Sequence, residues 1–81
     1  MWYVYVLLCS DSSLYTGSTN NIEKRFFHHI HGKGGAYTRS HKPVKILHSE
    51  SVATKSEALK REAYIKHLTR EMKIRELHLS V

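Results

Sequence analysis

The sequence predicts a mixed α+β fold in the order β-β-α-β-α, followed by a C-terminal helix. Three observations support this order. The chain opens with an unbroken apolar and aromatic run over Trp2–Cys9, which is typical of a buried strand. Two capping-box patterns, in which a capping side chain precedes a glutamate by three residues, mark the starts of two helices. Between them, apolar and polar residues alternate over Val44–Val52 as in a third strand.

The first two strands form an expected antiparallel hairpin. Four turn-forming residues, Ser10–Ser13, follow the first strand, which we expect to be covered on both faces. The expected partner strand is Ser13–Gly17. Gly17 ends it, at a point where a side chain would obstruct a turn or an approaching ligand.

The hairpin has two possible registers. If Cys9 lies opposite Ser13, the side chains of Tyr5 and Tyr15 project from the same face of the sheet. If Cys9 lies opposite Leu14, the two tyrosines point to opposite faces, because a shift of one residue moves every side chain across the sheet. The residue pattern leaves both registers open.

The first helix begins at a capping box formed by Asn20 and Glu23. Its expected buried stripe recurs every four residues and consists of Ile22, Phe26 and Ile30. Arg25 and His29 are also four residues apart and form a ridge beside that stripe, with His29 at the edge of the apolar arc. A side chain at the border of an apolar stripe faces a cleft more readily than open water. The alternative for Arg25 is a solvated arginine on the helix surface.

Glycines at Gly32–Gly35 end this helix, and a long loop extends to Pro43. The loop contains no acidic residue. Its basic residues and one aromatic ring are suited to contacting phosphates, although a solvated connection is equally compatible with the sequence. The residues concerned are Lys33, Tyr37, Arg39, His41 and Lys42. The nearby histidines His28, His29 and His31 lack accompanying cysteines or acids, so a zinc site is not favoured.

The second long helix begins at Thr54, which forms a capping box with Glu57, and is expected to run to about Thr69. Its expected buried stripe is Ala58, Ile65, Leu68 and Met72. The basic tail over Arg70–Val81 forms the last helix. Glu50, in the third strand, is a second candidate acid, for which an ion pair is the favoured role.

Glu62 occupies an informative position on the second long helix. On the helical wheel it falls at the edge of the apolar arc, where a carboxylate is seldom found unless it is paired or bound to a cation. One alternative is a salt bridge with Lys66, four residues later. The other is a carboxylate in a cleft that holds a divalent cation such as Mg²⁺, which uses few protein ligands and keeps several waters.

Composition points to a single basic domain, over residues 1–81, whose partner is nucleic acid. Thirteen Lys and Arg against seven Asp and Glu give a net charge of +6. The sequence contains no long cationic amphipathic helix of the kind that binds a membrane surface, so nucleic acid is the favoured partner. The opening apolar run is too short to span a bilayer and carries no leader, so we expect a soluble, cytoplasmic protein. The single cysteine, Cys9, is interpreted as a small buried hydrophobic residue in a reducing compartment.

Five elements in this order resemble the GIY-YIG nuclease superfamily: Tyr3-Val4-Tyr5, Tyr15-Thr16-Gly17, Arg25, His29 and Glu62. The likeness covers nearly the whole chain. It is greatest to a small stand-alone bacterial branch of mostly uncharacterised proteins, and it extends to the N-terminal domain of excinuclease C. The resemblance implies a three-stranded antiparallel sheet flanked by helices, and the hairpin register that places both tyrosines on one face. It also implies a cleft for metal-dependent phosphodiester cleavage.

Residue by residue, the resemblance assigns catalytic roles to Tyr5, Tyr15, Arg25 and His29. Tyr5 would help to deprotonate the attacking water, Arg25 would stabilise the transition state, and Tyr15 and His29 would position water or phosphate. Glu62 would hold one Mg²⁺ or Mn²⁺ ion. We expect further nucleic-acid contacts from Lys33, Arg39, Lys42 and Lys66.

The sequence departs from the family pattern at three places. Its first triplet is Tyr-Val-Tyr in place of Gly-Ile-Tyr, and Thr16 replaces isoleucine in the second. Ser18 stands where some relatives have a lysine that could lower the pKa of the tyrosine. The expected function is a Mg²⁺-dependent endonuclease acting on DNA, with branched, damaged or single-stranded DNA as candidate substrates and DNA repair as a candidate setting. The alternatives are a non-catalytic nucleic-acid-binding module that retains the cleft, and a protein-binding scaffold.

Overall fold

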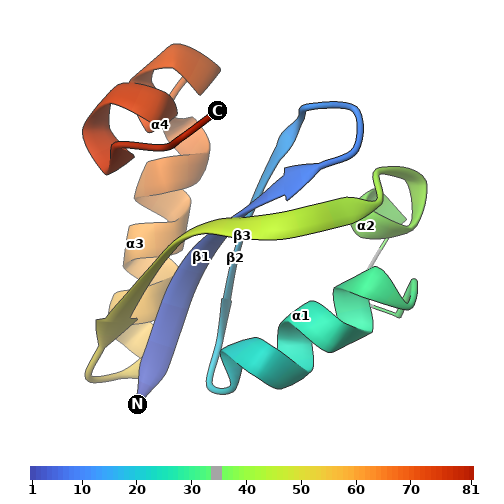
Figure 1. The fold of residues 1–81 in the computed structure, drawn as a ribbon. Coiled ribbons are helices and arrows are strands. Elements are labelled where there is room, and N and C mark those ends of the chain that lie inside the picture. The colour runs from blue at the N-terminus through green and yellow to red at the C-terminus, as the bar shows by residue number, and fades with distance from the viewer. Residues whose placement is uncertain (34–35) are drawn as a thin grey trace.

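The computed structural model describes residues 1–33 and 36–81 (Figure 1). It confirms the predicted α+β fold, with a three-stranded antiparallel sheet flanked by helices. The strands are β1 (Trp2–Cys9), β2 (Leu14–Thr19) and β3 (Pro43–Val52); the helices are α1 (Ile22–Ile30), α2 (Ala36–Ser40), α3 (Lys55–His67) and α4 (Arg70–Leu77). None of the helices in the described ranges is long and apolar enough to cross a bilayer.

Strand β1 lies at the centre of the sheet, between β2 and β3, and pairs antiparallel with both. The backbone N–H of Cys9 donates to the carbonyl of Ser13 over 2.9 Å, and Tyr5 pairs with Gly17. This is the register in which the two tyrosines share a face, so that prediction is confirmed. Because every strand residue alternates in direction, this register decides which chemistry each face of the sheet can carry.

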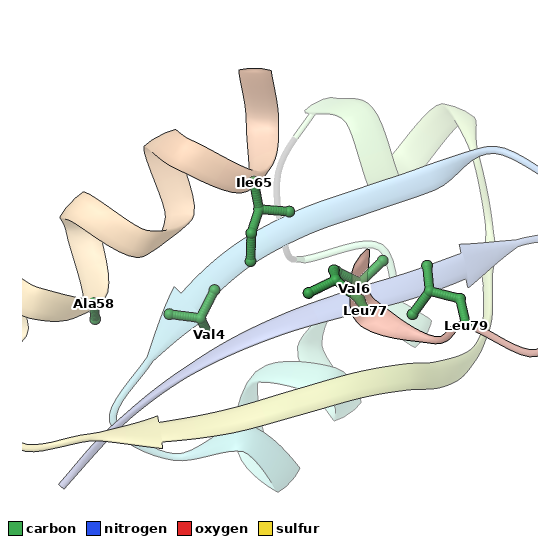
Figure 2. Close-up of a cluster of buried hydrophobic side chains, with 6 residues drawn as sticks. All are labelled: Val4, Val6, Ala58, Ile65, Leu77 and Leu79. Atoms are coloured by element: carbon green, nitrogen blue, oxygen red, sulfur yellow. The ribbon is translucent and has the colours of Figure 1, made fainter. Parts of the chain in front are cut away.

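Helices cover both faces of the sheet. In Figure 1, α3 and α4 lie on one side of the strands, and α1 and α2 lie on the other. Figure 2 shows the core on the α3 side, where two valines of β1 meet side chains of α3, α4 and the tail: Val4, Val6, Ala58, Ile65, Leu77 and Leu79. Tyr5 and Leu7 point to the opposite face and are also buried. The expectation that β1 is covered on both faces is therefore confirmed.

The second strand is longer than predicted, because Gly17 lies within it and does not end it. Strand β2 continues through Ser18 to Thr19, and both residues pair with β1. A glycine inside a strand often marks a place where another group approaches the backbone closely. Here that group is a side chain from the neighbouring strand, as described below.

Helix α1 begins one residue later than predicted, with Asn21 as the N-cap. The Asn21 side chain accepts a hydrogen bond from the backbone N–H of Lys24 over 3.1 Å. The predicted stripe is also rotated: Ile30 is 38% exposed, whereas His29 is fully buried. A histidine can occupy this position because both of its ring nitrogens have hydrogen-bond partners there.

The segment predicted as a loop contains the short helix α2. Gly32 has a φ of +74°, which favours glycine, and it follows the C-cap residue His31 at the end of α1, as predicted. Gly34 and Gly35, which were also expected to end the helix, lie outside the described residues. Helix α2 carries Thr38, which is only 3% exposed and faces the α1 side of the sheet.

The third strand predicted over Val44–Val52 is confirmed as β3, but its alternation does not bury Val44 and Ile46, whose exposed fractions are 56% and 36%. The pairing of β3 with β1 contains two register irregularities, which change the alternation of its side chains, and Leu47 packs against the core instead. Glu50 has the ion-pairing role favoured from the sequence. Its Oε1 lies 2.5 Å from Nε of Arg61, and this pairing lowers the pKa of Glu50 against the opposing effect of burial.

The second capping box is confirmed, since the Thr54 side chain accepts from the backbone N–H of Glu57 over 3.2 Å. The helix ends at His67, however, two residues earlier than predicted. The next residue has an extended backbone, and Thr69 caps the separate helix α4. This break ends the helical phase, so Met72 is 41% exposed although it was predicted to be buried.

Candidate active site

The phenol of Tyr5 lies directly over the backbone of Gly17. A Cβ atom at position 17 would lie 2.5 Å from the Tyr5 oxygen and 2.7 Å from Cζ, and 3.2 Å from Cε2 of Tyr15. These distances leave no room for any side chain at this position. The glycine therefore allows the Tyr5 ring to extend from β1 across β2, which is an edge strand of the sheet.

Aromatic rings from four elements gather beside this phenol. The His29 ring centroid lies 5.1 Å from that of Tyr15 and 5.9 Å from that of Tyr5, in edge-to-face arrangements. Tyr37 of α2 stacks on Tyr15 at 5.6 Å, and His41 stacks on Tyr37 at 4.1 Å. Such ring pairs are favourable, and they fix the orientations of the two phenols on the α1 side of the sheet.

A chain of hydrogen bonds connects β1, α1 and α2. The Tyr5 hydroxyl lies 2.9 Å from Nε2 of His29, and Nδ1 of His29 lies 2.8 Å from Oγ1 of Thr38. All three side chains are almost completely excluded from solvent. Buried polar groups of this kind depend on one another, because water cannot replace a lost partner.

Arg25, one helical turn before His29, faces the same group of rings. A hydrogen bond to Tyr5 raises the pKa of Arg25, and the charges that Tyr5 and Tyr15 can carry act in the same direction. The side chain is half-buried. A permanently charged guanidinium is therefore held beside two phenols in a partly desolvated position, where its field is stronger than in water.

Burial sets the protonation states of the site in its resting form. Desolvation raises the pKa of Tyr5 to about 12, although the hydrogen bond from Arg25 opposes the increase. Desolvation, together with the charges of Arg25 and His28, lowers the pKa of His29 to about 4. At neutral pH, Tyr5 is thus a neutral phenol, and His29 is a neutral imidazole that can accept a proton.

Glu62 lies close to this group but belongs to the other face of the sheet. Its Oε1 accepts a hydrogen bond from Ser18 over 2.5 Å, and its Oε2 lies 2.7 Å from the Lys66 ammonium. Ser18 pairs with Val4, so its side chain points toward α3, away from the phenols. The negative charge of Glu62 still contributes to raising the pKa of Tyr5.

The sequence prediction of one shared cleft therefore needs a correction. Tyr5, Tyr15, Arg25 and His29 come together on the α1 side of the sheet, as expected. The Glu62 carboxylate approaches the same edge strand from the α3 side. Both groups meet at β2, where Gly17 and Ser18 are adjacent and point to opposite faces.

The Glu62 side chain is chemically suited to hold a hard divalent cation. It is 18% exposed, and a cation already lies against it in the form of the Lys66 ammonium, which is itself 53% exposed. No group of three or more His, Cys, Asp or Glu suited to a metal ion occurs among residues 1–33 and 36–81. A single carboxylate is compatible with Mg²⁺, which completes its shell with waters and phosphate oxygens.

The basic residues predicted to contact phosphates form a rim that begins before α2 (Lys33), includes Arg39 of α2 and ends after it (Lys42). Lys33, Arg39 and Lys42 are exposed, and Arg39 lies beside Gly32. The backbone carbonyl of Lys42 accepts from the N–H of Ser10 over 2.8 Å, which ties the rim to the β1–β2 turn. The rim is therefore attached to the same hairpin that carries both tyrosines.

Sequence reasoning missed two contributors to the site. Thr38 could not be found from periodicity, because its segment was taken as a loop. The second is an open pocket of about 200 Å³ beside Arg25, whose lining includes polar and basic groups of α1 and the turn before it: Thr19, Asn20, Asn21, Lys24 and His28. The four-residue spacing of Asn20, Lys24 and His28 was a readable signal for a polar ridge.

Comparison with known proteins gives a consistent result. Residues 1–75 match the family model of the GIY-YIG catalytic domain. The chain is 54% identical to a UPF0213 protein of Clostridium perfringens, over 91% of this chain and 80% of that one. It is 56% identical to a UPF0213 protein of Syntrophus aciditrophicus, over 89% of this chain and 84% of that one.

A solved structure is similar over nearly the whole chain. The solution NMR structure of a UPF0213 protein from Bacillus halodurans aligns with a TM-score of 0.61 and 38% sequence identity, covering 96% of this chain and 84% of that one. The family model spans residues 1–75, which include all seven helices and strands except the last two residues of α4. This chain therefore belongs to the GIY-YIG family, as a relative of the small bacterial UPF0213 proteins.

Proposed function

We propose that this protein is an endonuclease that hydrolyses phosphodiester bonds of DNA with one bound Mg²⁺ or Mn²⁺ ion. Membership of a nuclease family whose members generally use divalent metal ions supports the reaction type. The observation that carries the proposal is the buried hydrogen bond between Tyr5 and His29 beside Arg25. In this arrangement Tyr5 is a proton donor, His29 is a proton acceptor and Arg25 is a fixed positive charge, all within one site.

Tyr5 is the proposed general base. A phenol is a poor base at neutral pH, so Tyr5 must first lose its proton, and Nε2 of His29 is the acceptor at 2.9 Å. The phenolate can then take a proton from the attacking water. Because the pKa of Tyr5 is about 12 and that of His29 is about 4, this transfer is strongly unfavourable in the resting protein and needs additional positive charge at the phenol oxygen to stabilise the phenolate.

Arg25 is the proposed group that supplies positive charge. Its guanidinium already donates a hydrogen bond to Tyr5, so it stabilises the phenolate more than the phenol. The same charge favours the additional negative charge that develops on a phosphate during cleavage. Tyr15, whose ring is held by His29 and Tyr37, is positioned to orient the phosphate or the water.

Glu62 is the proposed metal ligand. A bound Mg²⁺ would polarise the phosphate and stabilise the leaving oxygen. In this chain, Ser18 holds one carboxylate oxygen and thereby fixes the orientation of the group. Lys66 neutralises the carboxylate in the resting protein and is also a proposed contact to DNA, together with Lys33, Arg39 and Lys42.

One observation favours a second candidate function, a nucleic-acid-binding module without turnover. Tyr5 is only 1% exposed, so in the resting state its hydroxyl has almost no contact with water. Ser18 also provides no positive charge that would lower the pKa of the phenol. Binding without cleavage on every substrate and with every divalent ion would support this second function.

The two functions are separated by a cleavage assay on plasmid, single-stranded and branched DNA with Mg²⁺ or Mn²⁺. We expect cleavage by the wild-type protein and its loss with EDTA. Glu62→Ala and Tyr5→Phe should each reduce the rate by at least about a hundredfold. Glu71→Ala, which removes an exposed carboxylate of α4, is the matched control and should cleave normally. Unchanged cleavage in Glu62→Ala would overturn the metal assignment.

A further inference from the structure

We propose that Thr38 is a positioning residue that stabilises one ring tautomer of His29 by accepting a hydrogen bond from the proton of Nδ1, so that the lone pair of Nε2 faces the Tyr5 hydroxyl. This inference rests on the proposed function for its catalytic meaning, but its structural content can be tested without any cleavage assay. It assigns a role to helix α2, which contributes no residue to the proposed proton transfer and metal binding.

The geometry limits what His29 can do. Its two ring nitrogens have one partner each, Tyr5 at 2.9 Å and Thr38 at 2.8 Å. The ring is fully buried, and Thr38 is 3% exposed, so water cannot take over either hydrogen bond. A neutral imidazole carries only one N–H, and therefore one nitrogen donates while the other accepts.

The direction of donation follows from Arg25. A guanidinium can only donate, so the hydrogen bond between Arg25 and Tyr5 uses the phenol oxygen as acceptor. The phenol's own proton is buried and needs an acceptor, and among the described residues Nε2 of His29 is the group within hydrogen-bond distance, so Nε2 accepts. The single N–H of the ring is consequently at Nδ1, and it donates to Oγ1 of Thr38.

Among residues 1–33 and 36–81, the titratable and charged groups that face His29 are compatible with this assignment. Tyr5 of β1 and Tyr15 of β2 contact the ring, and Arg25 and His28 of α1 act on it electrostatically. Burial and the permanent charge of Arg25 keep the ring neutral at physiological pH, which preserves the choice between tautomers. The hydroxyl of Thr38 is the group that lies against Nδ1.

The tautomer matters for the proposed proton transfer. With the proton at Nδ1, the lone pair of Nε2 is aimed at the Tyr5 hydroxyl and can accept its proton. With the proton at Nε2, the ring would donate to the phenol oxygen and could not act as acceptor. Thr38 also remains a suitable partner after transfer, because an imidazolium donates from both nitrogens.

The test is ¹⁵N NMR of the histidine side chains in the full chain, which distinguishes protonated from unprotonated ring nitrogens. We expect wild-type His29 to carry its proton at Nδ1. Thr38→Ser, which retains the hydroxyl, should give the same pattern. Thr38→Val, which is similar in size but has no hydroxyl, should shift His29 toward the Nε2–H form. A wild-type ring protonated at Nε2, or an unchanged pattern in Thr38→Val, would overturn the inference.

Single-turnover cleavage provides the second readout. Thr38→Val should cleave about tenfold more slowly with unchanged DNA affinity, and Thr38→Ser should remain within about twofold of wild type. The two proposals can fail separately. A protein that never cleaves DNA but shows the Nδ1–H tautomer retains the positioning role and loses the proposed function. Normal cleavage by Thr38→Val with a shifted tautomer would remove the catalytic meaning of the contact. If Thr38→Val does not fold, the wild-type spectrum alone decides the tautomer.

Discussion

The Tyr5 phenol occupies the space in which a side chain at Gly17 would lie. An added Cβ would be 2.5 Å from the phenol oxygen, a distance shorter than Cβ atoms show in real proteins. The contact joins the last residue of the first triplet, Tyr3-Val4-Tyr5, to the last residue of the second, Tyr15-Thr16-Gly17. The phenol of Tyr5 and the absence of a side chain at position 17 are thus two parts of one packing arrangement.

We predict that Gly17→Ala displaces the Tyr5 ring and breaks its hydrogen bond to His29. The overpacking should destabilise the protein by about 1–3 kcal/mol and abolish cleavage. Urea unfolding measures the first effect and single-turnover cleavage the second. In a Tyr5→Val background the same alanine should cost much less stability, because the ring is gone. Equal destabilisation in both backgrounds would show that Tyr5 is not the group displaced.

We predict that Lys66→Met has opposite effects on metal and DNA binding. The Lys66 ammonium lies 2.7 Å from Oε2 of Glu62 and competes with any cation there. Because a pair this exposed is worth less than about 1 kcal/mol, Mn²⁺ affinity should increase by about two- to fivefold. DNA affinity should fall, because one positive charge is lost. Calorimetry with Mn²⁺ alone and a DNA-binding titration measure the two effects.

Lys60→Met, on the same helix, is the matched control for this substitution. Lys60 is exposed and lies two positions before Glu62 along α3. It should leave Mn²⁺ affinity unchanged. Weaker Mn²⁺ binding in Lys66→Met would contradict competition and indicate that Lys66 orients the carboxylate for the metal.

The fold was largely predictable because its signals are local. The N-cap at Thr54 and the apolar run of β1 depend on neighbouring residues in the sequence, and the structure retains both. The errors arose where a distant contact or a backbone irregularity decided the outcome. Met72 is exposed because the helix breaks at Leu68, and Ile46 is exposed because β3 pairs irregularly with β1. Neither event leaves a periodic signature.

The candidate site was predictable only in part, for a related reason. Tyr5 and Arg25 stand in short motifs whose spacing can be read directly from the chain. The role of Thr38 depends on α2 folding back beside α1, and nothing in its sequence neighbourhood indicates a buried hydroxyl. Likewise, helical periodicity placed Glu62 at the border of the core, but not on the opposite face of the sheet from the phenols.

We predict that the basic rim contributes to DNA affinity through electrostatics. Replacing Lys33, Arg39 or Lys42 with glutamine should weaken binding at low salt to a similar extent on all sequences. Each loss should reduce the slope of log affinity against log salt by about one. Binding titrations between 50 and 200 mM salt, a range of about 1.4 in natural-log units, are sufficient. Lys60→Gln serves as the control, and an unchanged slope in a rim variant would remove that residue from the interface.

We predict that His29 makes the stability of the protein depend on pH between about 4 and 6.5. Burial lowers its pKa from the ordinary 6.5 to about 4, and the charges of Arg25 and His28 act in the same direction. Within this window the unfolded chain binds more protons than the folded protein. Stability is therefore fully present above pH 6.5 and is lost as the pH falls toward 4, at no more than about 1.4 kcal/mol per pH unit.

The comparison that isolates this effect is urea unfolding of wild type and His29→Gln at several pH values from 5 to 7.5. Carboxylates with lowered pKa values, such as Glu50 and Asp11, also make stability depend on pH, but they are common to both proteins. The glutamine variant should be less stable at pH 7.5 and should lose less stability on acidification, so the two curves converge. His31→Gln, which changes an exposed histidine, should remain parallel to wild type. Parallel curves for His29→Gln would mean that His29 titrates alike in the folded and unfolded chains. That result would contradict the buried neutral imidazole on which the proton-transfer proposal depends.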